Sequence, residues 1–205
     1  MKEKNWLLNI IETGILAGIA ISVGGTVFLK VGGIIGAVLF SFGLTTVVYY
    51  KLKLYTGTAG FIQKGSLDDW TGLVFILLSN IVGCAIWASL MNGANPEFAD
   101  AAHKIIESRM NTGWLGCGIL AVGCGFIMTT AVQFARKDKY IALLLGVPCF
   151  IMCGFAHSIA DAFYFSVGYD MIDMTLVYIY LSEVAGNFIG CNLWRIVAPC
   201  LVDKL

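Results

Sequence analysis

The chain has 205 residues, of which 59% are hydrophobic and only 13% charged, and its formal net charge is zero. Its mean hydropathy is +0.84. So little charge excludes a soluble globular domain of this size and indicates a polytopic membrane protein, and nothing in the charge balance suggests nucleic-acid binding.

Apolar stretches of about 20 residues are needed to span a bilayer as helices, and the sequence predicts six of them. The six are Trp6–Leu29, Ile34–Tyr50, Trp70–Asn92, Trp114–Ala135, Ile141–Val167 and Thr175–Val197. The second is short and the fifth is long and interrupted, so we expect both to be discontinuous helices. The first is far longer than a signal-peptide core and no cleavage pattern follows it, so we expect it to be retained.

The segment between the third and fourth spans has a different pattern. Asn95, Pro96 and Glu97 are typical of a helix start, and apolar residues then recur at helical spacing from Phe98 to Ile106. We expect a short amphipathic helix there, on the outer face of the membrane.

Positive charges predict the orientation of the chain. Six spans place both termini on one side, and the segments of that side hold Lys2, Lys4, Lys64, Arg136, Lys137, Lys139, Arg195 and Lys204. The opposite segments hold Lys30, Lys104 and Arg109. Because cytoplasmic loops are enriched in Lys and Arg, we expect both termini in the cytoplasm and the protein in the plasma (inner) membrane.

Seven cysteines lie within or beside the spans, and Cys149 and Cys153 share a helix face. No histidine stands at ligand spacing from them, so we interpret them as small packing residues rather than ligands of a soft metal. We expect no metal, no cofactor and no disulfide framework.

The two halves of the sequence resemble each other at three places in the same order. The matches are Gly14–Ala17 with Gly118–Ala121 at an offset of 104, Asn80–Cys84 with Asn187–Cys191 at 107, and the breaks Tyr55–Gly57 and Ala156–Ser158 at about 101. Three spans per copy is an odd number, so the second copy must be inverted. We therefore expect two inverted repeats, residues 1–102 and 103–205, within one integral membrane domain.

Inverted repeats with paired broken helices place a transport site at the midplane, where the breaks meet. This arrangement predicts that Thr56 and His157 lie near each other. An ionisable residue in a span is costly and is by default functional, facing protein or a water-filled cavity. A purely structural histidine, hydrogen-bonded between helices, is the alternative.

Four segments resemble motifs of the formate/nitrite transporter family, whose members conduct small monovalent anions. Phe155-Ala156-His157-Ser158-Ile159-Ala160-Asp161 is similar to the family signature in the interrupted fifth helix, and Leu54-Tyr55-Thr56 to the loop of the second helix. Phe40–Leu44 and Gly186–Gly190 are similar to the stretches before that loop and in the sixth helix. The resemblance implies an all-α, aquaporin-like membrane protein with six transmembrane helices, the second and fifth interrupted, usually assembled as a homopentamer.

The resemblance also implies roles for individual residues. His157 corresponds to the family's central histidine, Thr56 to the threonine that faces it, and Asn187 to a pore-side asparagine. Leu44 falls at the cytoplasmic constriction and Phe150 at the outer one.

Three further residues are assigned in the same way. Leu54 and Tyr55 are expected to add to the walls of the constrictions. Lys104 is expected to supply the positive charge that the family places before the fourth span.

The sequence departs from the family pattern at four positions. Ala156 replaces a glutamate, Asp161 an asparagine, Lys53 an acidic residue and Val122 a pore-side asparagine. The departures affect substrate preference more than fold.

We hypothesise that Asp161 and Lys53 pair and so replace the usual charges. Glu183, one helical turn before Asn187, is expected to be a further partner for Lys51 or Lys53.

The predicted function is transport of formate, nitrite or hydrosulfide, with protons and the lipid bilayer as the other partners. Apolar rings at Leu44 and Phe150 exclude hydrated ions, while an anion between them hydrogen-bonds to Thr56 and His157. Protonation there would let a neutral acid cross, because burying an unpaired charge is the dominant cost. Histidine, with an unperturbed pKa of about 6.5, suits either proton donation or polarisation of the site.

Two other classes of function stay open. An aquaporin-like channel for neutral small solutes would show paired Asn-Pro-Ala motifs, which the sequence lacks. A membrane enzyme or redox protein would need paired histidines, an acid pair, a nucleophile elbow or a nucleotide loop, so we predict that the protein is not an enzyme.

Overall fold

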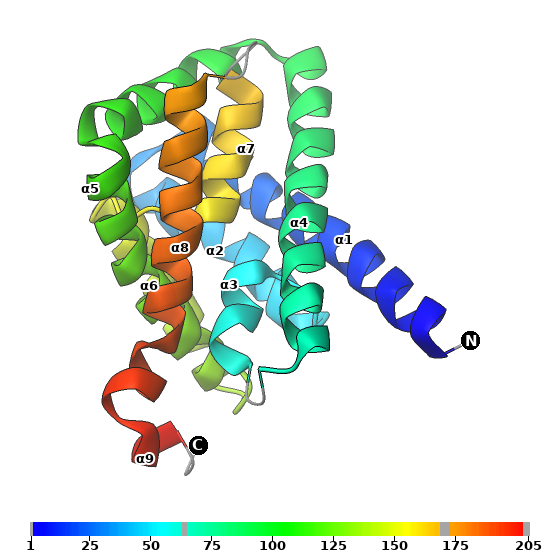
Figure 1. Cartoon of the computed structure of the whole chain (residues 1–205). Helices are drawn as coiled ribbons and strands as arrows, with labels where there is room; N and C mark the ends of the chain where they lie inside the picture. Colours follow the sequence, from blue (N-terminus) through cyan, green and yellow to red (C-terminus); the bar gives the residue numbers. More distant parts are fainter. Residues whose placement is uncertain (1, 63–64, 169–172, 203–205) are drawn as a thin grey trace.

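The structure is a computed structural model that describes residues 2–62, 65–168 and 173–202. These residues form a bundle of helices (Figure 1). In chain order the elements are α1 (Lys2–Val31), α2 (Gly33–Tyr49), α3 (Tyr55–Thr58), the 3₁₀ helix η1 (Ala59–Phe61), α4 (Leu67–Ala94), α5 (Glu97–Ala135), α6 (Ile141–Met152), α7 (Ser158–Gly168), α8 (Met174–Val197) and α9 (Pro199–Val202).

The long helices have the length and composition of membrane spans. In the described part of the chain, α1 from Trp6, α4, α5 and α8 are long and apolar enough to cross a bilayer, and α2 and α6 are shorter apolar helices. Large apolar side chains such as Ile35, Phe42 and Leu145 point outward and are exposed. An apolar outer surface of this kind is favourable in contact with lipid, so the chain is a multi-pass membrane protein.

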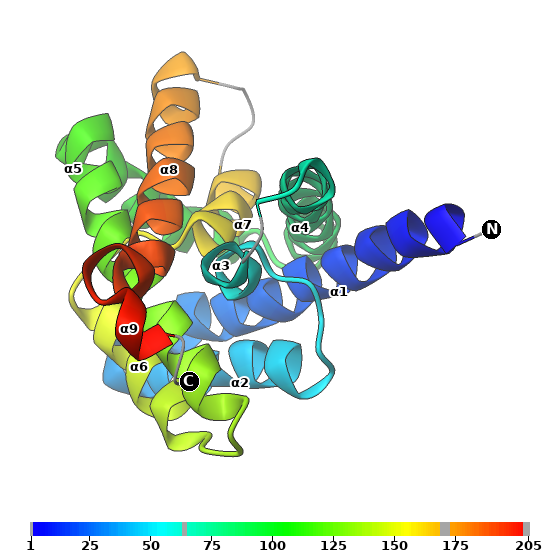
Figure 2. The same ribbon diagram turned by 60° about the horizontal axis from the view of Figure 1, so that its bottom comes forward.

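The second and fifth apolar stretches are interrupted, as the sequence predicts. The second consists of α2, a turn, and the short α3 and η1, which Figure 2 shows near the middle of the bundle. The helical segment after this turn begins at Tyr55. The fifth consists of α6 and α7, separated by residues 153–157.

Helix α4 begins three residues before the expected start at Trp70. The Ser66 hydroxyl accepts the Asp69 backbone N–H, and the Asp69 carboxylate accepts the Ser66 N–H. This reciprocal capping box satisfies two backbone donors that would otherwise lack partners at the helix start.

Helix α5 combines the expected amphipathic helix with the fourth span. Its two arms meet at Gly113, whose φ of 73° is in the left-handed region that favours glycine. The first arm therefore turns across the end of the bundle instead of continuing along it (Figure 1). Ala102 and Ile106 of this arm are buried, and a Cβ at Gly168 of α7 would meet their side chains.

Two pairs of helices approach each other closely at glycines. A Cβ on Gly18 of α1 would overlap the carbonyl oxygen of Asn80 in α4, and a Cβ on Gly125 of α5 would overlap that of Asn187 in α8. Small residues let helix backbones approach in membranes, where close packing is a main source of association energy. The α1–α4 and α5–α8 contacts are thus built alike.

We predict that Gly18→Ala destabilises the protein by about 1–3 kcal/mol, the usual cost of overpacking a tight contact. Gly93→Ala is the control, because a Cβ on Gly93 in α4 meets no atom within 4 Å. Thermal unfolding in detergent should show a lower midpoint for Gly18→Ala and little change for Gly93→Ala. Equal midpoints for the two variants would contradict the close packing of α1 on α4.

Candidate functional site

At the two interruptions, backbone N–H and carbonyl groups have no hydrogen-bond partner within a helix. Asn80 of α4 holds the first: its Nδ2 donates to the Lys53 carbonyl at 2.8 Å and to the Gly14 carbonyl at 2.8 Å, and its Oδ1 accepts the Tyr55 N–H at 2.9 Å. Asn80 is fully buried. Since an unpaired backbone group is costly at membrane depth, one asparagine makes this interruption tolerable.

Asn187 of α8 holds the second interruption in the same way. Its Nδ2 donates to the carbonyls of Ala156 and Ala121, both at 2.9 Å, and its Oδ1 accepts the Ser158 N–H at 2.9 Å. Asn187 is fully buried and is not among the residues that line the two cavities described below. The structure thus places it behind the interruption, although the resemblance implied a pore-side position.

The two sets of hydrogen bonds also define how the interruptions correspond. Each asparagine brackets one residue, Leu54 in the first interruption and His157 in the second. The corresponding offset is therefore 103, from Leu54 to His157, and not the 101 inferred from the sequence. Thr56 is thus not the counterpart of His157 but faces it from the other interruption.

Two cysteines connect each half to the interruption of the other. The Cys84 thiol of α4 donates to the Ile159 carbonyl at 3.3 Å, and the Cys191 thiol of α8 donates to the Thr56 carbonyl at 3.3 Å. Their sequence pattern predicts packing residues only. A thiol is a weak donor, but both are buried, so each contact helps to fix a half-helix of one half of the chain to a long helix of the other half.

Thr56 and His157 meet where the interruptions meet, as the sequence predicts. The Thr56 Oγ1 and the His157 Nε2 are 3.0 Å apart, and both side chains are buried. The other ring nitrogen, Nδ1, accepts the Ala160 N–H at 3.1 Å, so it carries no hydrogen. These partners assign the neutral tautomer with the proton on Nε2, which donates to the Thr56 hydroxyl.

The contact is enclosed by apolar side chains. The Phe150 ring stacks on the His157 ring, with centroids 5.6 Å apart, and meets the edge of Phe40 at 6.2 Å. Leu44 and Leu54 are buried on the other side.

Tyr55, which was expected at a constriction, donates its hydroxyl to the Val184 carbonyl of α8. It is not among the lining residues of either cavity.

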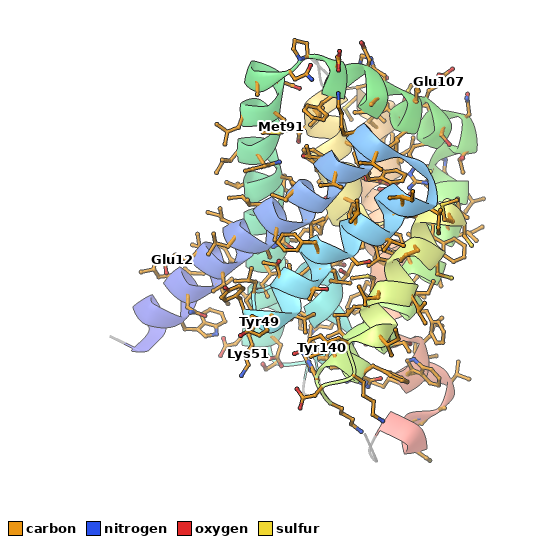
Figure 3. The ribbon with its side chains drawn as sticks, turned by 180° about the vertical axis from the view of Figure 1, so that it is seen from behind. Glu12, Tyr49, Lys51, Met91, Glu107 and Tyr140 are labelled. Atoms are coloured by element: carbon orange, nitrogen blue, oxygen red, sulfur yellow. The ribbon has the colours of Figure 1, made fainter. Side chains whose placement is uncertain are left out.

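A first cavity of about 570 Å³ opens on one side of this contact. Leu44 and Leu54 line its inner part, and Lys51, Lys53 and Arg136 supply positive charge. Figure 3 shows Lys51 with Tyr49 and Tyr140 at this end of the bundle and Glu107 at the opposite end.

Arg136 lies over the Phe61 ring at 3.6 Å from its centroid. Partial burial lowers the pKa of its guanidinium, but an arginine stays charged at neutral pH.

A second cavity of about 240 Å³ opens on the other side and reaches His157 and Phe150. Lys104, Arg109 and Asp161 line it as well. Lys104 is exposed on the first arm of α5 and lines this cavity. The two cavities thus place basic groups on both sides of the Thr56–His157 contact.

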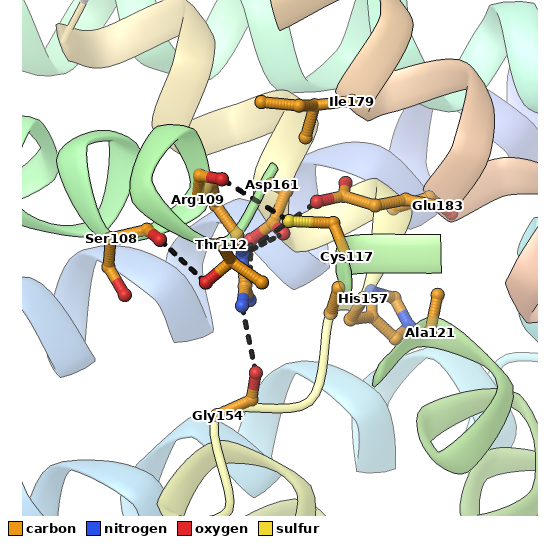
Figure 4. Close-up of polar contacts among 12 residues, drawn as sticks. Ser108, Arg109, Thr112, Cys117, Ala121, Gly154, His157, Asp161, Ile179 and Glu183 are labelled. Atoms are coloured by element: carbon orange, nitrogen blue, oxygen red, sulfur yellow. Dashed lines mark hydrogen bonds and ion pairs between the residues drawn. The ribbon is translucent and has the colours of Figure 1, made fainter. Parts of the chain in front are cut away.

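The expected pairing of Asp161 with Lys53 is wrong. The Asp161 carboxylate accepts the Arg109 Nε at 2.8 Å, while Lys53 is exposed at the first cavity (Figure 4). Asp161 follows the second interruption and Lys53 lies within the first, and they line different cavities. Glu183 also lies near Arg109, 3.7 Å from its Nε, and not near Lys51 or Lys53.

Arg109 is the site residue that the sequence analysis missed. Besides binding Asp161, it donates from Nη1 to the Gly154 carbonyl at 2.8 Å and from Nη2 to the Phe155 carbonyl at 3.3 Å (Figure 4). It therefore satisfies backbone oxygens of the second interruption that Asn187 does not reach. The apolar spacing that predicted the outer helix ends at Ile106, so it did not point to Arg109.

Comparison with known proteins agrees with this geometry. A sequence model of the formate/nitrite transporter family matches residues 2–199. A probable formate transporter of Methanothermobacter thermautotrophicus is 27% identical, over 95% of this chain and 90% of that protein. The formate channel FocA of Escherichia coli K12 is 27% identical over 70% of this chain, and the match spans 56% of FocA.

Two solved structures have similar folds. One is described as a pentameric formate channel with formate bound, with a TM-score of 0.77, 20% identity and coverage of 97% of this chain and 96% of that chain. The other, an FNT family ion channel, has a TM-score of 0.82 at 17% identity and covers 98% of this chain and 92% of that chain. At these identities the likeness shows the fold.

We predict that Asn187→Ala destabilises the protein more than an exposed asparagine substitution does. It leaves the Ser158 N–H and the Ala156 carbonyl unpaired, at about 1–3 kcal/mol for each buried group. Asn111→Ala is the control, because Asn111 is an exposed residue of α5. Thermal unfolding in detergent should separate the two variants, and a midpoint unchanged by Asn187→Ala would show that the interruption does not depend on this side chain.

Proposed function

The chain belongs to the formate/nitrite transporter family, and from this premise we propose that it conducts small monovalent anions such as formate, nitrite or hydrosulfide. Members of this family are channels or transporters and not enzymes. The observation that carries the proposal is the Thr56–His157 contact, enclosed by apolar side chains between two cavities with basic walls.

The basic side chains account for the sign of the substrate. Lys51, Lys53 and Arg136 at the first cavity and Lys104 at the second raise the local concentration of anions. Among the described residues, Asp138 is the acid that lines the first cavity, so acids do not match the three basic side chains there in number. An anion reaching either inner wall then meets the apolar barrier.

The apolar side chains between the cavities select against hydrated ions. Leu44 and Leu54 bound the first cavity, and Phe150 bounds the second. A narrow apolar passage excludes ions that keep their water, while a weak acid in its neutral form crosses more easily. Protonation of the anion on its way across is therefore part of the proposal.

The assigned tautomer favours a hydrogen-bonding role for His157. Its Nε2–H donates to Thr56, which leaves the Thr56 hydroxyl hydrogen free to donate to an anion. Protonating the ring further would require Nδ1 to give up the Ala160 N–H at 3.1 Å. We propose that His157 and Thr56 polarise the anion together and that the proton comes from water.

The arrangement of the protein in the membrane is proposed from the sequence and the fold. We propose cytoplasmic termini in a plasma membrane, with the first cavity facing the cytoplasm. Two inverted repeats are supported by the matching hydrogen bonds of Asn80 and Asn187. The division at residues 102 and 103 falls inside α5, so the turn at Asn95–Pro96 is the nearer structural boundary.

A homopentamer is supported by the similarity to a pentameric channel.

The proposal is tested by uptake of formate, nitrite, hydrosulfide and glycerol into proteoliposomes, with and without an inward proton gradient. We expect anion uptake that rises with proton supply. His157→Asn should lower it about 10-fold to 100-fold, because Thr56 loses the Nε2–H donor that leaves its own hydroxyl hydrogen free to donate to the anion, and a hydrogen bond to a charged group is worth about 1.5–3 kcal/mol. Asparagine is a good N-cap residue and can still accept the Ala160 N–H. A loss of uptake is therefore due to the missing imidazole ring and not to a disturbed start of α7.

Two outcomes would contradict the proposal. Uptake of glycerol alone, unchanged by the substitution, would indicate a channel for neutral solutes and a structural His157. Anion uptake that does not respond to the proton gradient would exclude crossing as a neutral acid.

A second prediction concerns the Thr56 hydroxyl. Thr56→Val keeps the shape of the side chain but removes its donor, and should lower anion uptake about 10-fold, the cost of one such hydrogen bond. Thr56→Ser keeps the hydroxyl and should retain most of the uptake. Equal uptake by the two variants would exclude a hydrogen-bonding role for Thr56.

A third prediction concerns the charge of the first cavity. Lys53→Gln should lower the rate of anion entry roughly twofold to fivefold at low ionic strength, and the effect should shrink as salt screens the charge. Lys139→Gln makes the same charge change nearby, on a residue that does not line the cavity, and should have less effect. A salt-independent loss in Lys53→Gln would point to a structural cause.

A further inference from the structure

Glu183 of α8 is an acid buried without hydrogen bonds. Its side chain has no exposed surface, and within the described part of the chain neither carboxylate oxygen accepts a hydrogen bond. Its nearest cation is Arg109, and the 3.7 Å between Nε and Oε1 is longer than a hydrogen bond. A buried carboxylate in this position is not stabilised by the contacts around it.

Arg109 is already committed to other acceptors. Its Nε donates to the Asp161 Oδ2 at 2.8 Å, and its Nη2 lies 3.5 Å from Oδ1, so the guanidinium binds both oxygens of that carboxylate. Its Nη1 and Nη2 also donate to the carbonyls of Gly154 and Phe155. Asp161 is therefore the ionised partner of Arg109.

Among the described residues, the other ionisable neighbours of Glu183 bring no further positive charge. They are Cys117 and Cys124 of α5, Asp161 of α7 and Tyr180 of α8. The carboxyl groups of Asp161 and Glu183 both face the Arg109 Nε, at 2.8 Å and 3.7 Å. Two ionised carboxylates cannot hydrogen-bond to each other, because each only accepts, so a hydrogen bond between these two acids requires one of them to carry a hydrogen.

We propose that Glu183 is a proton-binding site, in which its protonated carboxyl donates a hydrogen bond to the Asp161 carboxylate that Arg109 holds. One cation, one carboxylate and one neutral acid then give the buried cluster no net charge. Figure 4 shows the three side chains converging beside the His157 interruption, with Glu183 coming from α8. Ala156 leaves no acid next to His157 in sequence, and Glu183 brings one from another helix.

The site has a consequence for transport, which rests on the proposed function. Asp161 lines the second cavity, so the proton of Glu183 exchanges with water there through Asp161. When the proton leaves to water, the cluster changes from neutral to a net charge of minus one beside the path of the anion. Anion passage is thereby favoured when Glu183 is protonated and disfavoured at higher pH.

The protonated state is tested by infrared spectroscopy of the reconstituted full-length protein at neutral pH in H₂O and D₂O. A protonated carboxylic acid has a carbonyl stretch that is separate from the carboxylate bands and shifts in D₂O. We expect such a band in the wild type and its loss in Glu183→Gln. Glu107→Gln, at an exposed acid on the same arm as Arg109, is the control and should keep it.

A wild type without this band, or a band that persists in Glu183→Gln, would overturn the proposal. Asp161→Asn is a second variant in case Glu183→Gln does not assemble. It removes the carboxylate that Arg109 holds, so Glu183 should ionise to balance Arg109 and the band should vanish although Glu183 is present. A band that persists in Asp161→Asn would also overturn it.

The infrared result does not depend on the transported substrate, so it separates this proposal from the proposed function. In proteoliposomes that do take up anions, uptake by Glu107→Gln should fall with rising pH as it does in the wild type. Uptake by Glu183→Gln should lose that component of the pH response. An unchanged pH profile in Glu183→Gln would contradict the link to transport.

Discussion

The backbone of an interrupted helix must find hydrogen-bond partners inside the membrane, and the rest of this structure depends on how two asparagines meet that requirement. Asn80 and Asn187 each pair one N–H and one carbonyl of an interruption, and each also ties that interruption to a neighbouring helix. Without water at that depth, unpaired peptide groups would favour a continuous helix. The asparagines thus make it possible to end two helices in the middle of the bundle.

The fixed positions of the two interruptions also bring Thr56 and His157 into contact. Thr56 lies in the first turn of one half-helix and His157 precedes the other, and they meet at 3.0 Å because each interruption is fixed to the same core. The His157 ring is oriented by the Ala160 N–H on one side and by Thr56 on the other. Its state as a neutral hydrogen-bond donor is the central claim of the proposed mechanism, because it makes His157 a polarising group and leaves proton supply to water.

The sequence predicted the interrupted helices and the meeting of Thr56 with His157, because glycine and polar residues inside an apolar stretch are a strong local signal. It did not predict the ion pairs. Arg109 was placed in an outer segment by its position between the third and fourth predicted spans, and the turn at Gly113 that carries its arm over the bundle leaves no periodic signal. Asp161 was therefore paired with Lys53, the basic residue of the other interruption.

Sequence similarity also aligned the two repeats only approximately. Similarity alone aligned Thr56 with His157, whereas hydrogen bonds align Leu54 with His157, because the residues that Asn80 and Asn187 bracket do not resemble each other. The role of Cys84 was invisible for a related reason, since a buried cysteine has the same pattern whether it packs or donates. Sequence patterns thus identify where a helix breaks, but the contacts that stabilise the break come from distant residues.

The state of His157 is measured most directly by solid-state nitrogen-15 NMR of histidine-labelled protein in lipid. The chain has two histidines, so His103→Gln leaves His157 as the single signal. The structure predicts, at neutral pH, one protonated nitrogen assigned to Nε2 and one unprotonated nitrogen assigned to Nδ1. A doubly protonated ring, or a proton on Nδ1, would contradict the polarising role of His157.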